Sequence, residues 1–119
     1  MKTLIMGAST DPHRFSFRAA HMLVDYGHEI ALFGRSSGEI AGIAIRGELP
    51  EASAGVELVT WYLKAEHQDA YKAQIFALKP KRMIFNPGAE NPSLMKEAEA
   101  LGIDCVEDCT LVMLQQGRF

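Results

Sequence analysis

The amino-acid sequence predicts an α/β fold in which a five-stranded, mainly parallel sheet carries helices on both faces. Short apolar runs rich in β-favouring residues alternate along the chain with segments that have helical spacing. Parallel strands need crossover connections, and most of these segments have the helical character that such connections show. The 119 residues are 48% apolar, enough for one core, so we expect a single domain over residues 1–119.

Five runs combine apolar residues with β-branched or aromatic ones, the composition typical of strands. They are residues 3–6, 29–33, 56–63, 82–85 and 103–106. Small and turn-forming residues cluster after these runs. The carboxyl ends of parallel strands share one edge of the sheet, where open α/β sheets bind ligands.

Two helices are predicted between the first four strands. Apolar residues recur at helical spacing over residues 16–26, and Gly27 is placed to end that helix. The same spacing recurs over residues 66–78, and Pro80 prevents continuation of the second helix.

The two remaining predicted helices have recognisable first residues. Asn91 is suited to the N-cap of a third helix, with Pro92 at its first position and Gly102 after its end. The segment that begins with Asp108 can form a last helix, with the Asp108 carboxylate as its cap.

The segment between the second and third predicted strands is less regular. Residues 34–55 are rich in Gly, Ser and Ala, and they contain one short apolar alternation at residues 43–45. We therefore expect a turn, a short extended piece and a connection here, in place of a full helix.

Composition argues against several classes of protein. The chain has 12 Lys and Arg residues against 15 Asp and Glu, a net charge of −3, without the basic excess of a nucleic-acid-binding domain. Its apolar runs are far shorter than the ~20 residues of a membrane helix, and no signal-type segment is evident, so we expect no membrane association and a cytoplasmic protein. Cys105 and Cys109 have no partners at zinc-like spacing, so neither a metal site nor a disulfide scaffold is predicted.

The loop after the first strand, "GASTDP", has the small residues that let a phosphate approach the backbone. Gly7 and Ala8 leave room for a pyrophosphate, and Ser9 and Thr10 each add a hydroxyl donor. The loop has a single glycine, so it matches neither the dinucleotide pattern G-x-G-x-x-G nor the P-loop pattern. A plain β-to-α turn is the alternative interpretation.

The loop after the second strand reads "FGRSSG", where an NAD-binding domain usually has an acidic residue. Arg35 and the two serines that follow it suit a phosphate on the adenosine ribose, as in NADP or in the 3′-phosphate of coenzyme A (CoA). A merely solvated arginine is the alternative.

The loop after the fourth strand reads "NPG". Pro87 and Gly88 form a rigid turn at the mouth of the expected cleft, and Asn86 can hydrogen-bond a ligand. A purely structural turn is equally compatible with this spacing.

Five motifs in order, "GASTDP", "GRSSGEIAGI", "LVTWYL", "IFNPGAEN" and "CTLVML", carry a resemblance that spans essentially the whole chain. On these motifs the chain resembles the small CoA-binding proteins of the YccU type. That group is similar to the CoA-binding Rossmann-like domain of the succinyl-CoA synthetase α subunit. The resemblance implies a Rossmann-like three-layer αβα sandwich with the strand order 3-2-1-4-5, and CoA lying across the strand ends.

The resemblance also implies cofactor-binding residues at the ends of the strands. The pyrophosphate loop would consist of Gly7, Ala8, Ser9 and Thr10, shaped by Asp11, Pro12 and Ser16. Gly34 and Arg35 would meet the adenosine 3′-phosphate, and Tyr62 and Leu63 would border the adenine or ribose. The pantetheine side would be lined by Asn86, Pro87 and Gly88, near Cys109.

Two positions depart from the pattern of the group. Asp11 stands where relatives often carry Asn, and its carboxylate would repel phosphates unless Arg14 or Arg35 neutralises it. Asp108 stands where relatives often carry Ala, and it adds a second negative charge.

No catalytic constellation is evident in the sequence. Cys109 at a helix start has the position of a nucleophile or of a disulfide partner for the CoA thiol, whereas a small packing residue is the alternative. The four histidines fall on different segments and have no evident triad partner. We therefore expect no catalysis.

Three functions remain open at this point. The first is a non-catalytic module that binds CoA or an acyl-CoA. The second is a small NADP-binding oxidoreductase or sensor. The third is an interaction protein with a vestigial cleft that works as a homodimer. The apolar C-terminal stretch can pack against a second subunit, and burial within the monomer is the alternative that we favour for it.

Overall fold

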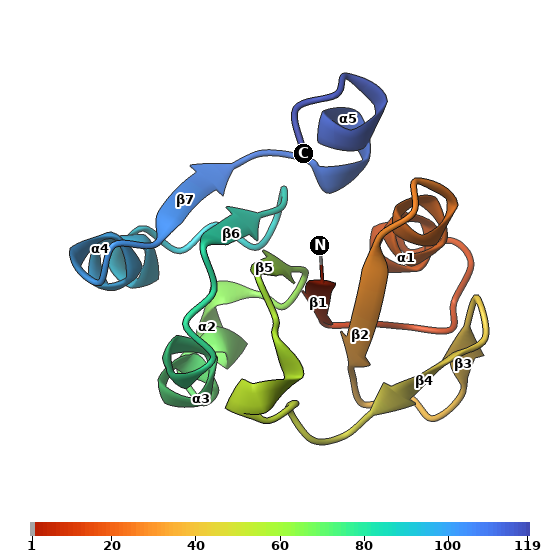
Figure 1. Cartoon of the computed structure of the whole chain (residues 1–119), viewed down its shortest axis with the longest axis horizontal. Helices are drawn as coiled ribbons and strands as arrows, with labels where there is room; N and C mark the ends of the chain where they lie inside the picture. Colours follow the sequence, from red (N-terminus) through yellow and green to blue (C-terminus); the bar gives the residue numbers. More distant parts are fainter. Residues whose placement is uncertain (1) are drawn as a thin grey trace.

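The computed structural model of the protein describes residues 2–119. These residues form a seven-stranded sheet in the order β3-β4-β2-β1-β5-β6-β7 (Figure 1). Along the sheet the strands are β3 (Glu39–Ile40), β4 (Ile43–Arg46), β2 (Glu29–Phe33), β1 (Lys2–Met6), β5 (Leu58–Trp61), β6 (Arg82–Phe85) and β7 (Asp104–Glu107). Neighbouring strands are parallel except β3 and β4, which are antiparallel. The predicted α/β class and mainly parallel sheet are confirmed.

The predicted number and order of strands were wrong. The sheet has seven strands in place of five, because β3 and β4 both lie within the segment expected to be mostly turn and connection. The expected order placed the run at residues 56–63 outside the second strand, but this run forms β5 and pairs with β1. The position next to β2 is taken by β4, through the pairs Leu32↔Ile45 and Phe33↔Arg46.

A two-residue turn explains how the short segment after β2 returns as a parallel strand. Ala41 and Gly42 join β3 to β4, and both have positive φ, at 54° and 79°. A turn with two left-handed residues matches the twist of an antiparallel hairpin. The hairpin therefore replaces the crossover helix that usually connects two parallel strands.

The helices cover both faces of the sheet (Figure 1). One face carries α1 (Phe15–Asp25) and α5 (Thr110–Gln115); the other carries α2 (Ala65–Gln68), α3 (Lys72–Ala77) and α4 (Pro92–Ala100), with a 3₁₀ turn at Ala52–Ala54 before β5. The predicted helix over residues 66–78 is broken into α2 and α3. None of the helices in the described residues is long and apolar enough to cross a bilayer.

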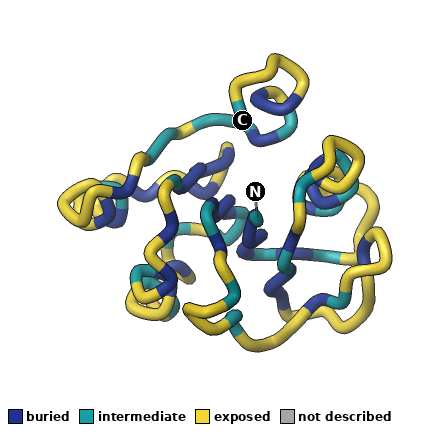
Figure 2. The backbone as a smooth tube through the Cα atoms, in the orientation of Figure 1, coloured by how far each residue is buried: buried dark blue, intermediate teal, exposed yellow. Residues whose placement is uncertain are grey.

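Two apolar layers hold the helices to the sheet. Leu4, Trp61 and Phe85 are buried on the face that α3 and α4 cover. Ile5 and Leu32 point to the opposite face, where they pack with α1 and α5. Figure 2 shows that the central strands are buried and that exposed residues concentrate in loops and on the outer faces of the helices. This burial explains why the central strands read as nearly continuous apolar runs.

The predicted helix starts were partly right. The Asn91 side chain accepts the backbone N–H of Leu94 at 3.1 Å, as expected of an N-cap, and Pro92 begins α4. The expected cap of the last helix was wrong, because Cys109 is its N-cap and makes no side-chain capping bond. Asp108 instead accepts the N–H of Cys109 at 2.7 Å and an Arg118 hydrogen bond at 2.7 Å.

Candidate functional site

Strand order reverses at β1, which has β2 on one side and β5 on the other. A cavity of about 480 Å³ lies at the carboxyl ends of these three strands, where open α/β sheets bind ligands. We call it the switch-point cavity. It is lined by Gly7, Ala8, Arg14, Phe33, Gly34, Arg35, Ser36, Tyr62, Leu63, Lys64, His67, Ala70 and Tyr71.

Two glycines allow the loops that form this cavity to meet. A Cβ on Gly34 would overlap the carbonyl oxygen of Ala8, so the loop after β2 can touch the loop after β1 only with glycine at this position. Gly7 has a φ of 107°, and a Cβ there would lie 3.1 Å from the Leu63 nitrogen. Backbone therefore approaches backbone from β1, β2 and β5 at one point.

In the loop after β1, which we call the first loop, some backbone N–H groups donate hydrogen bonds within the fold and others do not. The N–H groups of Gly7 and Ala8 both donate to the carbonyl of Phe33, at 2.9 and 2.8 Å. Among the described residues, the N–H groups of Ser9 and Thr10 have no hydrogen-bond acceptor. Free amide donors for an anion thus begin at Ser9, two residues later than the sequence alone suggested.

The cavity is lined by cationic side chains. Arg14, Arg35 and Lys64 contribute three positive charges. Arg14 lies 3.9 Å from the Asp11 carboxylate and His67 lies 3.8 Å from that of Glu66. No Asp or Glu belongs to the lining. This arrangement contrasts with the net charge of −3 of the whole chain and favours an anionic ligand over a cationic one.

The start of α1 adds to the positive character of this region. Its N-cap is Arg14, which makes no side-chain capping bond, and the first turn holds no acidic residue. The partial positive charge of the helix N-terminus therefore lies beside the guanidinium, and the nearest carboxylate is that of Asp11 in the preceding loop, 3.9 Å from Arg14.

Asp11 has a structural role in the same loop. Its carboxylate accepts the N–H of His13 at 2.9 Å and lies 3.9 Å from the Arg14 guanidinium, while its own N–H donates to the Ser9 hydroxyl at 3.1 Å. The condition set by the sequence, that an arginine neutralise Asp11, is met by Arg14.

Asn86 belongs to a buried network at the carboxyl ends of β5 and β6. Its Nδ2 donates to the Thr60 hydroxyl at 2.7 Å and to the Trp61 carbonyl at 2.8 Å, and its Oδ1 accepts the N–H of Thr110 at 2.9 Å. The hydroxyls of Thr60 and Thr110 are 2.8 Å apart. With 2% of its surface exposed, Asn86 ties β5, β6 and α5 together.

Two further side chains, those of Tyr62 and Cys109, lie close to this network. Burial raises the pKa of Tyr62 to about 12; the nearby hydroxyls of Thr110 and Thr60 oppose this shift, but the Tyr62 hydroxyl has no hydrogen-bond partner in the described structure. Cys109 is half-buried, and both it and Cys105 are free thiols. The described residues include no cluster of His, Cys, Asp or Glu that could hold a metal ion.

The structure brings some of the predicted site residues together and leaves others outside the cavity wall. The wall contains Gly7, Ala8, Gly34, Arg35, Tyr62 and Leu63. The predicted residues outside it are Ser9, Thr10, Asp11, Pro12, Ser16, Asn86, Pro87, Gly88 and Cys109. The sequence reasoning missed five residues of the wall, which are Phe33, Lys64, His67, Ala70 and Tyr71. The position of Lys64 directly after the third predicted strand was an available signal.

A larger groove of about 880 Å³ lies along β2 and β4 and the segment that follows β4. Its charged side chains, Lys2, Arg46 and Glu48, are of both signs. Because the groove lacks both the converging strand ends and the uniform charge, the switch-point cavity is the better candidate for an anion site.

Residues 1–115 match the family model of a CoA binding domain. The chain belongs to this family. A crystal structure of a protein described as uncharacterized is 43% identical, with a TM-score of 0.94 over 99% of this chain and 97% of that protein. No curated protein matches the chain.

More distant structures share the fold of this CoA binding domain. A protein from Thermus thermophilus is 20% identical, with a TM-score of 0.85 over 99% of this chain and 90% of its own. A hypothetical protein from Pyrococcus horikoshii is also 20% identical, with a TM-score of 0.85 over 97% and 81%.

Proposed function

We propose that the chain binds CoA or an acyl-CoA in the switch-point cavity, as a single-domain, non-catalytic and cytoplasmic module of the YccU type. Membership in a CoA binding domain family supports the ligand class. The observation that carries the proposal is the cavity itself, which has cationic side chains from three loops and no carboxylate in its lining.

The residues fit the anionic groups of CoA. The pyrophosphate would lie against the first loop, where Ser9 and Thr10 offer free N–H groups and hydroxyls, with Arg14 and the start of α1 beside it. The 3′-phosphate would be bound by Arg35 and Ser36, which follow β2.

An aromatic wall suits the adenine. Phe33 and Tyr71 line the cavity with their rings in an edge-to-face arrangement, 4.9 Å between centroids. Aromatic faces stack on a purine, and Tyr62 and Leu63 would border the same half of the ligand.

The pantetheine arm would follow the turn at Pro87 and Gly88 toward Cys109. Both turn residues are exposed, and Gly88 has a φ of 92°. Asn86 would stabilise this turn, because its side chain makes hydrogen bonds with Thr60, Trp61 and Thr110.

The same cavity leaves NADP as a second candidate. Arg35 and Ser36 would meet a ribose 2′-phosphate as readily as a 3′-phosphate, because a guanidinium recognises either group by the same paired hydrogen bonds.

Calorimetric titration with CoA, 3′-dephospho-CoA and NADP tests the proposal. We expect CoA to bind, and Arg35→Ala to weaken CoA about tenfold while leaving 3′-dephospho-CoA nearly unchanged. Lys96→Ala is the matched control, since it removes one exposed positive charge from α4. Equal affinity for CoA and 3′-dephospho-CoA would reject the role of Arg35, and binding of NADP without CoA would reject the ligand.

A further inference from the structure

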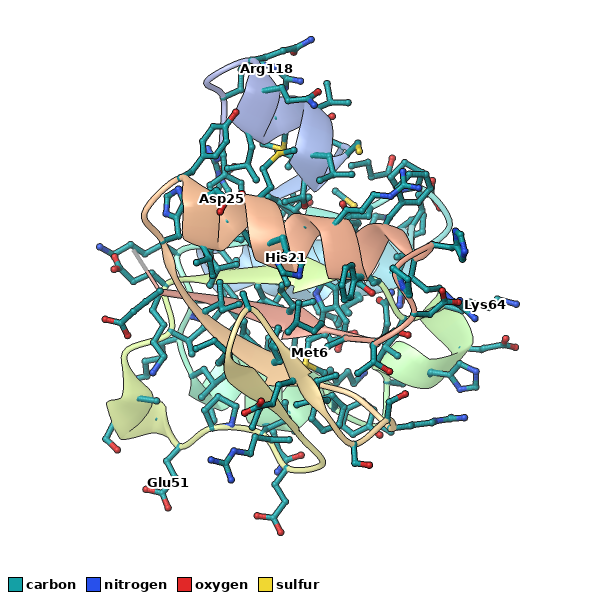
Figure 3. The ribbon with its side chains drawn as sticks, turned by 90° about the vertical axis from the view of Figure 1, so that its right-hand side faces the viewer. Met6, His21, Asp25, Glu51, Lys64 and Arg118 are labelled. Carbon is teal, nitrogen blue, oxygen red and sulfur yellow. The ribbon has the colours of Figure 1, made fainter. Side chains whose placement is uncertain are left out.

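The outer surface of α1 carries large side chains that no other part of the described chain covers. This surface consists of the exposed residues Phe15, Arg18 and Asp25 of α1 and Tyr26 at its C-cap. Met22 lies between them and is half-buried, because it also packs against the core. Phe15 is 60% exposed and Tyr26 52%. Figure 3 shows α1 across the front of the molecule, with His21 and Asp25 on its outer side and no element over it.

Part of this surface is hollow. A depression of about 420 Å³ is bordered by Arg18, Met22, Asp25 and Tyr26, with Pro12, Phe17 and His21 also in its lining. The exposed ring of Tyr26 borders this depression, so an aromatic ring of a partner has a place to insert beside it. Exposed apolar side chains alone are common on monomers, so the identity of the partner must come from another observation.

The order of the charged side chains on the outer surface of α1 indicates which partner would bind there. Arg18 and Asp25 lie two helical turns apart on this surface, about 10 Å along the axis. Arg18 lies over the ring of Phe15, 5.4 Å from its centroid, and neither it nor Asp25 takes part in an ion pair within the described residues.

These charges are complementary to a second copy of themselves. A two-fold axis through the middle of α1, between His21 and Met22, makes the helices of two copies antiparallel. Arg18 of each copy then faces Asp25 of the other. The midpoint of Phe15 and Tyr26 is displaced by one residue from this axis, so Phe15 of one copy and Tyr26 of the other lie across from each other with an offset of two residues, about 3 Å along the helix.

We propose that two copies of the chain associate through the outer surfaces of α1, antiparallel about this two-fold axis. The interface is isologous, because each surface supplies both members of every facing pair. A helix of 11 residues offers less than the ~800 Å² per partner of a standard interface, so the dimer is weak and depends on concentration.

The competing surface at the C-terminus is largely used within the monomer. Met113 and Leu114 are each 3% exposed and pack against the sheet and α1. The apolar C-terminal stretch therefore completes the core of its own chain, and α1 is the better candidate for contact between copies.

Charge reversal tests this geometry by sedimentation equilibrium without ligand. We expect the wild-type chain to dimerise as concentration rises. Arg18→Asp and Asp25→Arg should each weaken the dimer about tenfold, because two attractive pairs become two repulsive ones. An equimolar mixture of the two variants should dimerise again, since every facing pair between unlike chains is then of opposite sign.

Two further variants separate the interface from general effects. Lys96→Asp reverses a charge on α4 and should leave the dimer unchanged, whereas Tyr26→Ser should weaken it without changing any charge. A wild-type chain that stays monomeric up to about 1 mM would overturn the proposal. So would a dimer that either reversal leaves intact, or a mixture that fails to restore association. Because no CoA is present, these outcomes are independent of the proposed ligand.

Discussion

The contact between the first and second loops predicts a large effect of adding one methyl group. Gly34→Ala would place a Cβ in overlap with the carbonyl oxygen of Ala8, 3.1 Å from its carbonyl carbon and 3.3 Å from its nitrogen. All three atoms are backbone, so no side chain can rotate to make room. Gly34 does not have a positive φ, and the strain is therefore purely steric.

The expected loss of stability is about 3 kcal/mol. Extra methyl groups in well-packed interiors cost roughly 1–3 kcal/mol, and the upper end applies where rigid backbone must move. The Ala8 N–H donates to the Phe33 carbonyl, so moving this loop also disturbs a hydrogen bond of 2.8 Å between the loop after β1 and the end of β2. The substitution should therefore weaken CoA binding as well as the fold.

Urea denaturation of three glycine variants isolates the steric cause. Gly34→Ala tests close contact without positive φ. Gly102→Ala tests the opposite case, a φ of 84° with nothing within 4 Å, and should cost about 1–2 kcal/mol. Gly47→Ala has neither feature and should be neutral or stabilise by up to about 1 kcal/mol. A Gly34→Ala midpoint equal to that of Gly47→Ala would refute the close approach of the two loops.

Four further predictions concern single side chains. Between about pH 10 and 12 the unfolded chain releases the Tyr62 proton while the folded chain keeps it. In denaturant titrations the free energy of unfolding of the wild type should therefore fall by about 1.4 kcal/mol per pH unit more than that of Tyr62→Phe, in which Cys105 still titrates. Ala41→Asn should raise the melting temperature by relieving a φ of 54° in the hairpin turn. Burial, with Glu99 and Asp104 nearby, raises the pKa of Cys105 to about 11, so mass spectrometry should find its alkylation at neutral pH slower than in the unfolded chain. Asn86→Leu should destabilise the protein by about 2–4 kcal/mol in urea, because it leaves the buried N–H of Thr110 without its acceptor and removes the Nδ2 donor from the Thr60 hydroxyl and the Trp61 carbonyl.

The sequence predicted the strands well because burial on both faces makes a strand apolar throughout. All five predicted runs are strands, and helix starts such as Asn91 carry a local chemical signal. Strand order carries no such signal. It depends here on the two-residue turn at Ala41 and Gly42, and an alanine in a left-handed conformation does not mark a hairpin in the sequence as Asn-Gly would.

The cavity residues that could be predicted from the sequence are those that directly follow a predicted strand. Gly7, Gly34 and Arg35 follow strands directly, so their place at the edge of the sheet could be inferred before the structure. His67 could not be inferred in this way, because it lies within α2. The sequence predicted one continuous helix over residues 66–78, whereas the structure has two short helices, α2 and α3. Asn86 shows the opposite difficulty. An amide after a strand suits a ligand and a buried network equally, and only the three hydrogen bonds it makes distinguish them.

The missing crossover helix after β2 has a consequence for the proposed function. In a β-α-β unit the helix that follows a strand directs its N-terminal amides and dipole at a bound phosphate. The first loop has this arrangement through α1, but β2 leads into a loop and the β3–β4 hairpin. A phosphate beside β2 would therefore depend on side-chain charge, chiefly that of Arg35. Salt screens an exposed guanidinium more effectively than partly buried amides. CoA should consequently lose more affinity than 3′-dephospho-CoA when ionic strength is raised, and an equal loss for both would contradict this division between the two loops.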